Sequence, residues 1–366
     1  MPRKQTTSSS KSSSPRPSSD QKTTSSKAVI LDVGHGNCAV VVDREATTVI
    51  DAALGGVLLD YLRDHKIECV DTVLISHADA DHIAGLIGLL STENLIVRNV
   101  YLNPDAVRTS KIWDDLKSVM KEARVTKKTT IKNALSTTVP GELVMGDALI
   151  QVLAPTPEFA IAGIGGKDLN GQRVSAHSLN AVIRLVYRKK LLALFPGDLD
   201  EIGLSNIQAE GTEIAADVLV FPHHGGVPGK HPEAFTETLC KMVKPTLIVF
   251  SIGRGKHATP RPEVISTIKR VSPGAHIACT QLSERCASKP PGVAGSHLSG
   301  EISLGSEKGH CCAGTIVIIP SPVQPILSKH TEFIEIAAPT ALCKKVPTSD
   351  GNRVNKAVPK GGWRGR

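Results

Sequence analysis

The stretch Ser76–Leu86 reads SHADADHIAGL, and it carries the strongest functional signal in the chain. It follows TVLI (Thr72–Ile75), an apolar run typical of a buried strand, and it leads into residues with the apolar spacing of a helix. Four side chains of metal-binding type fall within six residues: His77, Asp79, Asp81 and His82. This pattern predicts a metal-binding loop between a strand and a helix. The alternative is a polar turn in which Asp81 only caps the helix.

Two further polar clusters also follow apolar strands. FPGD ends at Asp198, and PHHGG places His223 and His224 after DVLVF. Because loops at the ends of neighbouring strands converge on one rim in many α/β architectures, we expect these side chains to meet the first cluster. Metal-assisted hydrolysis needs several His and carboxylate ligands delivered from the loop ends of rigid elements.

This series resembles the metal site of the metallo-β-lactamase-fold hydrolases. That family carries an HxHxDH motif, a lone His, an Asp that bridges two metal ions, and a final His. The matching positions are, in chain order, His77, Asp81, His82, Asp198 and His223, with His224 as the alternative for the last. The resemblance covers roughly residues 28–280 and implies two divalent metal ions as cofactors. It also implies an α/β fold, an αββα sandwich of the metallo-β-lactamase type.

Within that family the sequence is most similar to the hydrolase domain of the ComEC-type competence proteins. The shared segments are LDVGHGNCAVV from Leu31, VIDAALGG around Asp51, HxDxDH, and PHHG followed by SIG…P from Ser251. Asp79 replaces the second His of the lactamase motif, which makes the site richer in oxygen, so either Zn²⁺ or Mn²⁺ is a reasonable metal. His177, 21 residues before Asp198, is the candidate for the lone His ligand.

The resemblance implies hydrolysis by a water or hydroxide that bridges the two metals. Asp198 would bridge the ions, and Asp81 would orient this water or take up its proton. The ComEC-like features favour a phosphodiester substrate, so a phosphodiesterase or nuclease is the leading interpretation. The alternatives are hydrolysis of a small-molecule ester, thioester or lactam by the same fold, and a non-catalytic, metal-stabilised interaction module.

Three residues around these motifs have two interpretations each. Asp51 either supports the metal site, as in the ComEC-like proteins, or caps a turn. His35 lies in the Gly-rich opening DVGHGN and either faces substrate or belongs to a tight backbone turn. His257, in GRGKHATP, either contacts substrate or is an ordinary loop histidine.

The chain divides into a folded body and two tails. Residues 28–320 alternate strand and helix signals, which indicates two β-rich layers covered by helices in one hydrolase domain, with a Cys-containing insertion at about 280–312. Within this domain we expect a hairpin that turns at Arg188–Lys190, and helices from about Pro232 to Met242 and from about Pro262 to Arg270. We also expect His177 at the start of the strand that leads to Asp198. Residues 1–27 are rich in Ser, Thr and Pro and are predicted to be disordered. Residues 321–366 form an extension that ends in a basic tail.

The net charge of +8 is located in the tails. Residues 1–27 contain six Lys/Arg and one Asp, and residues 341–366 contain seven Lys/Arg and one Asp, which leaves about −3 for the body. The tails therefore suit phosphate contacts with nucleic acid, or else they only keep the protein in solution. No run of 18 apolar residues and no secretory signal is present, so we expect a cytoplasmic protein that does not contact membrane.

The eight cysteines are interpreted as thiols or metal ligands rather than disulfides. Four of them surround the insertion: Cys279, Cys286, Cys311 and Cys312. Their spacing matches no zinc knuckle, so buried thiols beside the strand AGTIVII are the first interpretation and a structural Zn²⁺ is the second.

Overall fold

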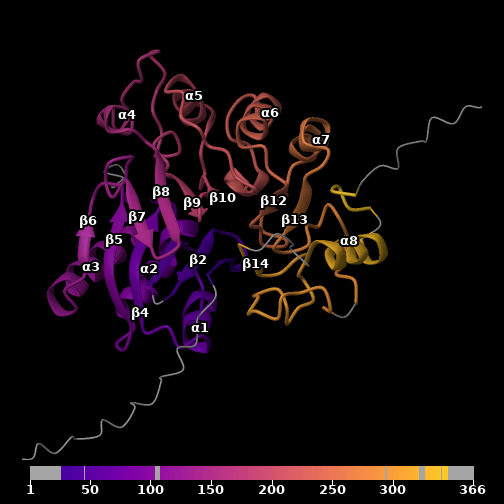
Figure 1. Cartoon of the computed structure of the whole chain (residues 1–366), viewed down its shortest axis with the longest axis horizontal. Helices are drawn as coiled ribbons and strands as arrows, with labels where there is room; N and C mark the ends of the chain where they lie inside the picture. The colour runs from indigo at the N-terminus through magenta and orange to yellow at the C-terminus, as the bar shows by residue number, and fades with distance from the viewer. Residues whose placement is uncertain are drawn as a thin grey trace, which may run out of the picture.

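Two β-sheets lie face to face and carry helices on both outer sides, as Figure 1 shows. The structure is a computed structural model, and it describes residues 26–44, 46–103, 108–292, 295–320, 326–338 and 340–344. The predictions for the two tails lie outside these residues, apart from the inner end of each tail.

The first sheet is mixed. Its seven strands, in spatial order within the described residues, are β14 (Ile316–Ile318), β1 (Lys27–Ile30), β2 (Cys38–Asp43), β3 (Ala46–Ala52), β4 (Cys69–Ile75), β5 (Ile96–Leu102) and β6 (Thr130–Lys132). Neighbours from β14 to β3 are antiparallel, and those from β3 to β6 are parallel. The parallel half carries the strand that leads into SHADADH.

The second sheet has the same mixed character. Its seven strands, again in spatial order within the described residues, are β13 (His276–Cys279), β12 (Leu247–Phe250), β11 (Val218–Val220), β10 (Lys190–Phe195), β9 (Val182–Tyr187), β8 (Ala148–Ala154) and β7 (Glu142–Met145). Strands β10 to β13 are parallel, and β7 to β10 are antiparallel. The parallel strands β10 and β11 lead into the other two polar clusters.

Helices cover the outer faces of both sheets (Figure 1). The described helices are α1 (Val57–Asp64), α2 (Ala80–Ser91), α3 (Lys111–Thr126), α4 (Pro157–Ile161), α5 (Glu201–Ala209), the 3₁₀ turn η1 (Pro222–Gly225), α6 (Pro232–Val243), α7 (Pro262–Val271) and α8 (Ile326–Ala337). Helices α1 to α3 share a hydrophobic core with the first sheet, and α5 to α8 share one with the second.

A third core fills the space between the sheets. Successive side chains of a strand point to opposite faces, so each inner strand contributes to two cores. In β11, Val218 and Val220 face the first sheet, whereas Leu219 faces the helices. Burial on both faces explains why these parallel strands read as unbroken apolar runs such as LIVF in β12. The αββα class predicted above is therefore confirmed.

Most predicted elements lie where the sequence indicates. The hairpin around Arg188 is present as β9 and β10, and α6 and α7 begin at Pro232 and Pro262 as predicted. One placement was wrong: His177 precedes β9 by a short loop and is not at the start of that strand. None of the helices in the described part of the chain has the length and apolar character that a membrane span requires.

Candidate metal centre

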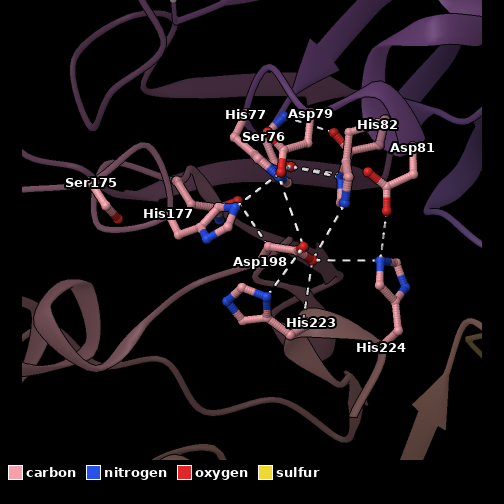
Figure 2. A network of polar contacts seen from close by, with 12 residues as sticks. Ser76, His77, Asp79, Asp81, His82, Ser175, His177, Asp198, His223 and His224 are labelled. Atoms are coloured by element: carbon pink, nitrogen blue, oxygen red, sulfur yellow. Dashed lines mark hydrogen bonds and ion pairs between the residues drawn. The ribbon is translucent and has the colours of Figure 1, made fainter. Parts of the chain in front are cut away.

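Three loops at the carboxyl ends of β4, β10 and β11 meet at one edge of the sandwich. They carry Ser76–Asp79, Asp198 and the turn η1, respectively. Strand β4 belongs to the first sheet, and β10 and β11 belong to the second, so the loops approach from the two halves of the fold. His177 joins them from the loop before β9, as Figure 2 shows.

The metal-binding side chains form two groups among the described residues. The first consists of His77, Asp79 and His177, and the second of Asp81, His82, Asp198 and His224. In each group, one ligand atom per residue lies within 4.8 Å of the ligand atoms of the others. Both groups mix imidazole nitrogens with carboxylate oxygens, which suits Zn²⁺ and also harder divalent ions.

Asp198, a member of the second group, lies between the first group and the other members of the second in Figure 2. Its Oδ1 atom is 3.4 Å from His82 Nε2 and 3.7 Å from His224 Nε2. Its Oδ2 atom is 3.9 Å from His77 Nε2, in the other group. One carboxylate therefore reaches both groups, one oxygen toward each.

Three buried imidazole nitrogens at the centre have no hydrogen-bond partner among the described residues: His77 Nε2, His82 Nε2 and His223 Nε2. An unpartnered polar atom in the interior costs free energy, about 1–3 kcal/mol each. A divalent cation would satisfy such lone pairs. The orphaned nitrogens and the neighbouring carboxylates therefore fit bound metal ions.

The charges of these groups depend strongly on one another. Burial alone would raise the pKa of Asp198, but the imidazoles of His82, His224 and His77 hold it well below its usual value. The pKa values of Asp79 and Asp81 are likewise lowered against burial, chiefly by hydrogen bonds to His177 and to His224. All three carboxylates are thus kept ionised, as metal ligands must be.

The imidazole ring of His82 is held in position by Asp51. Asp51 Oδ2 is 2.8 Å from His82 Nδ1, and the same carboxylate accepts hydrogen bonds from the backbone N–H and the hydroxyl of Ser76. Burial disfavours a charged His82, yet Asp51 and Asp198 raise its pKa well above the usual value. Because Nδ1 is held by Asp51, Nε2 faces Asp198. A carboxylate behind a ligating histidine fixes the ring and increases its basicity.

Replacing Asp51 by Asn should weaken Zn²⁺ binding by about 10–100-fold, because the amide cannot hold the ring of His82 as the carboxylate does. Competition against a chromophoric chelator measures this change. Asp43→Asn is the matched control: Asp43 is also buried and accepts a 2.6 Å hydrogen bond from the Ala148 N–H, but it lies at the far end of β2. Equal losses in both variants would show that Asp51 acts only on the fold.

Asp79 has a partner that the sequence analysis missed. Its carboxylate is 3.1 Å from His177 Nε2 and 3.6 Å from His77 Nε2, and it also forms an ion pair with Arg108. Arg108 precedes α3 in a segment without any motif, so no sequence signal identified it. Its guanidinium contributes to lowering the pKa of Asp79.

The structure assigns His224, not His223, to the second group. His224 Nε2 is 3.2 Å from Asp81 Oδ2, and its Nδ1 is 2.7 Å from the Ser251 carbonyl oxygen. Both histidines have left-handed backbones, with φ of 51° and 54°, which turns His224 back toward Asp81. His223 lies on the other side, with its ring 4.7 Å from that of His177. His223, the sequence-based preference for the final ligand of the series, has its Nδ1 atom 3.4 Å from Asp198 Oδ2, and its role as a ligand stays a prediction.

His35 and His257 lie beside this second group. His35 Nε2 is 3.4 Å from Asp81 Oδ2, and its ring is 4.4 Å from that of His224 and 4.2 Å from that of His257. Burial and the neighbouring His224 lower the pKa of His35 to about 4. His257 is exposed. The ring of His35 therefore lies between the ring of His224 in the second group and that of the exposed His257.

Residues 31–157 match the family model described as the metallo-beta-lactamase superfamily. The chain has the metallo-β-lactamase fold. The matched segment is about a third of the chain; it contains Asp51 and the SHADADH loop, and it ends before His177, Asp198 and His224. The part of the fold beyond residue 157 supplies the remaining members of both groups.

Several solved structures have a similar fold. YhfI, a metallo-beta-lactamase fold protein from Bacillus subtilis, is 14% identical over 69% of this chain and 96% of its own, with a TM-score of 0.42. Tm1679, named as a metal-dependent hydrolase of the beta-lactamase superfamily, is 18% identical over 69% and 95%, with a TM-score of 0.42. Igni18, a metallo hydrolase from Ignicoccus hospitalis, is 15% identical over 70% and 95%, with a TM-score of 0.38. No curated protein matches the chain.

Proposed function

We propose that this chain is a hydrolase that uses two divalent metal ions and cleaves phosphodiesters, in the manner of a phosphodiesterase or nuclease. The observation that carries the proposal is the position of Asp198, whose two oxygens reach separate groups of metal-binding side chains. His77, Asp79 and His177 would hold one ion, and Asp81, His82 and His224 the other. Bound there, the ions would lower the pKa of a water molecule and neutralise charge on a phosphoryl group.

The chain's own residues would bind and orient the reactants. The carboxylate of Asp81 is kept ionised by His224 and is partly open to solvent, so it can accept a hydrogen bond from an attacking water and orient it. His35 lies 3.4 Å from the same carboxylate and can donate a hydrogen bond to a substrate oxygen. Burial of His77, His82 and Asp198 excludes bulk water from the floor of the site.

The charges around the site favour an anionic substrate. Arg108 lies against Asp79 on one side. On the other side, the loop that carries Lys256 and His257 is close enough to His35 for both residues to affect its pKa. These groups would attract a phosphate, whereas a neutral ester or lactam would gain less from them. The ComEC-like motifs around Asp51 and Ser251 support the same substrate class.

The basic tails provide a way for a polymeric substrate to be held. Five Lys/Arg in residues 1–26 and six in residues 345–366 would contact phosphates without sequence preference, whereas Lys27 and Lys344 form ion pairs with Glu301 and Glu335. DNA or RNA is therefore the partner we propose.

One observation favours a second candidate, the hydrolysis of small molecules. Residues 28–340 carry a net charge of about −3, whereas the surface of a nuclease groove is usually basic. A small ester or thioester would need contact only with the residues around the metal groups.

The test is hydrolysis by the purified chain after loading with Zn²⁺ or Mn²⁺. Single-stranded DNA, single-stranded RNA and bis(p-nitrophenyl) phosphate are the substrates, and a chelated sample is the blank. We expect metal-dependent cleavage of at least one phosphodiester. Cleavage of p-nitrophenyl acetate or a thioester alone would move the function to the second candidate. No turnover of any of these substrates by a chain that carries two metal ions would refute the hydrolase.

A further inference from the structure

Four of the eight cysteines lie beside β13, an edge strand of the second sheet, outside the metal centre described above. Cys279 ends β13, Cys286 lies in the turn that follows, Cys312 precedes β14, and Cys343 follows α8. All four belong to, or pack against, the hydrophobic core beneath α5 to α8. They come from four separate segments, and their assembly was not visible in the spacing of the sequence.

The four thiols lie close enough to one another to interact. The thiol of Cys312 interacts directly with that of Cys279, and Cys286 and Cys343 are close enough for charge on one thiol to affect the others. The turn with Cys286 is tied to the chain after α8: Thr340 Oγ1 donates a 2.7 Å hydrogen bond to the Cys286 carbonyl oxygen. The backbone N–H of Leu342 also reaches the Cys286 thiol.

His330 of α8 joins the cluster as a nitrogen donor. It is 1% exposed, and its Nε2 atom is 3.2 Å from Cys312 Sγ. Its other nitrogen, Nδ1, is 2.9 Å from His276 Nε2, so the orientation of the ring is fixed from behind. Metal-ligating histidines usually have such a second hydrogen bond, which sets the ring orientation and the tautomer. This arrangement exceeds what packing of the thiols alone would require.

We propose that Cys279, Cys286, Cys312, Cys343 and His330 form a second, structural metal site, in which four of these five donors bind one Zn²⁺. Thiolate and imidazole donors are the ligands that Zn²⁺ prefers in structural sites. The five donors lie near one another but do not surround a single point. Among the described residues, no three of their ligand atoms lie mutually within 4.8 Å. Rotation of the thiols about their Cα–Cβ bonds would accompany binding.

The location gives the ion a structural purpose. Residues 280–312 are rich in Gly, Ser and Pro and form turns and isolated bridges rather than long strands in the part that the structure describes. A zinc ion would join this insertion, β13 and α8 at one point, in place of a larger apolar core. A cavity of about 540 Å³, lined in part by His276, His330 and Cys343, provides a path for the ion.

Elemental analysis of the full chain, purified with a thiol reductant, tests the site. The catalytic groups are first disabled by His77→Ala, His82→Ala and Asp198→Asn, which remove a ligand from each group, so that the count reports the cysteine cluster alone. We expect about one zinc per chain to survive dialysis, and to be lost when Cys312→Ser is added. Cys311→Ser is the matched control, because Cys311 is the next residue and buried, but its thiol points to Asp32 Oδ2 at 3.7 Å. It should keep the zinc.

Measurements on the wild-type chain keep the test valid if Cys312→Ser does not fold. Cobalt substitution should give near-ultraviolet thiolate-to-metal charge-transfer bands, and a mercurial should release zinc in proportion to the thiols it modifies. Absence of both signals would refute the site. So would six free thiols rather than eight in the denatured, unreduced chain, because that count means a disulfide. Failure of the hydrolase proposal would leave these results unaffected, since none of them measures turnover.

Discussion

The Asp198→Asn variant should fold, fail to hold two metal ions, and lose hydrolytic activity by about 10³-fold or more. Asp198 reaches both groups through separate oxygens, and an amide offers only one weaker acceptor in their place. Loss of metal-based stabilisation costs several kcal/mol of barrier height, which corresponds to that factor in rate. Metal content by elemental analysis and turnover of the best phosphodiester substrate measure the two effects together.

The matched control for this variant is Asp200→Asn. Asp200 follows in the same loop, but its carboxylate accepts hydrogen bonds from the hydroxyls of Ser175 and Ser178 and from the Gly203 N–H at the start of α5. This variant should lose some stability and keep both metals. If Asp198→Asn kept two metals and full turnover, the assignment of Asp198 as the shared ligand would be wrong.

The Gly197→Ala variant should be destabilised by about 2–5 kcal/mol, from the sum of backbone strain and overpacking. Gly197 has a φ of +51°, and a Cβ there would be 2.5 Å from Ser76 Oγ and would also collide with Asn180 Oδ1. That same amide oxygen accepts a 3.0 Å hydrogen bond from the Asp198 N–H. The clash therefore displaces the Asn180 side chain that holds the backbone of Asp198, and metal affinity should fall as well. Urea unfolding and metal titration measure the two changes.

Gly211→Ala separates strain from collision. Gly211 also has a positive φ, +66°, but an added Cβ meets nothing within 4 Å. It should cost only about 1–2 kcal/mol and leave metal affinity unchanged. Equal destabilisation of the two variants would mean that the contacts around Gly197 relax freely.

The fold could be predicted because its signals are local. Apolar runs such as TVLI and LIVF are buried on both faces. The three strands that precede a polar cluster, β4, β10 and β11, all end at the edge of the sandwich where the metal-binding groups lie. Helices α6 and α7 begin with Pro, whose fixed φ suits a first helical turn, so their start points were predicted from the sequence. Helix α5 was not predicted, because Gly203, Ser205 and Asn206 weaken its apolar pattern.

The parts of the site that were not predicted depend on contacts between distant segments. Sequence cannot tell which of the adjacent His223 and His224 turns toward Asp81, since the choice lies in two left-handed backbone residues. The pairing of Arg108 with Asp79 joins a helix-leading segment to a strand-end loop with no motif in between. The approach of His330 to Cys312 likewise depends on where α8 packs.

The origin of the ligands from both sheets has a consequence for the interior of the sandwich. His77 and His82 follow β4 of the first sheet, whereas Asp198 and His224 follow β10 and β11 of the second. The distance between the two halves of the site is then set by the thickness of the core that separates the sheets, where side chains such as Leu74 and Phe195 pack. Because protein interiors are closely packed, a single methylene gained or lost in that layer changes the spacing of the sheets. The packing of the core between the sheets therefore sets the spacing of the metal-binding side chains.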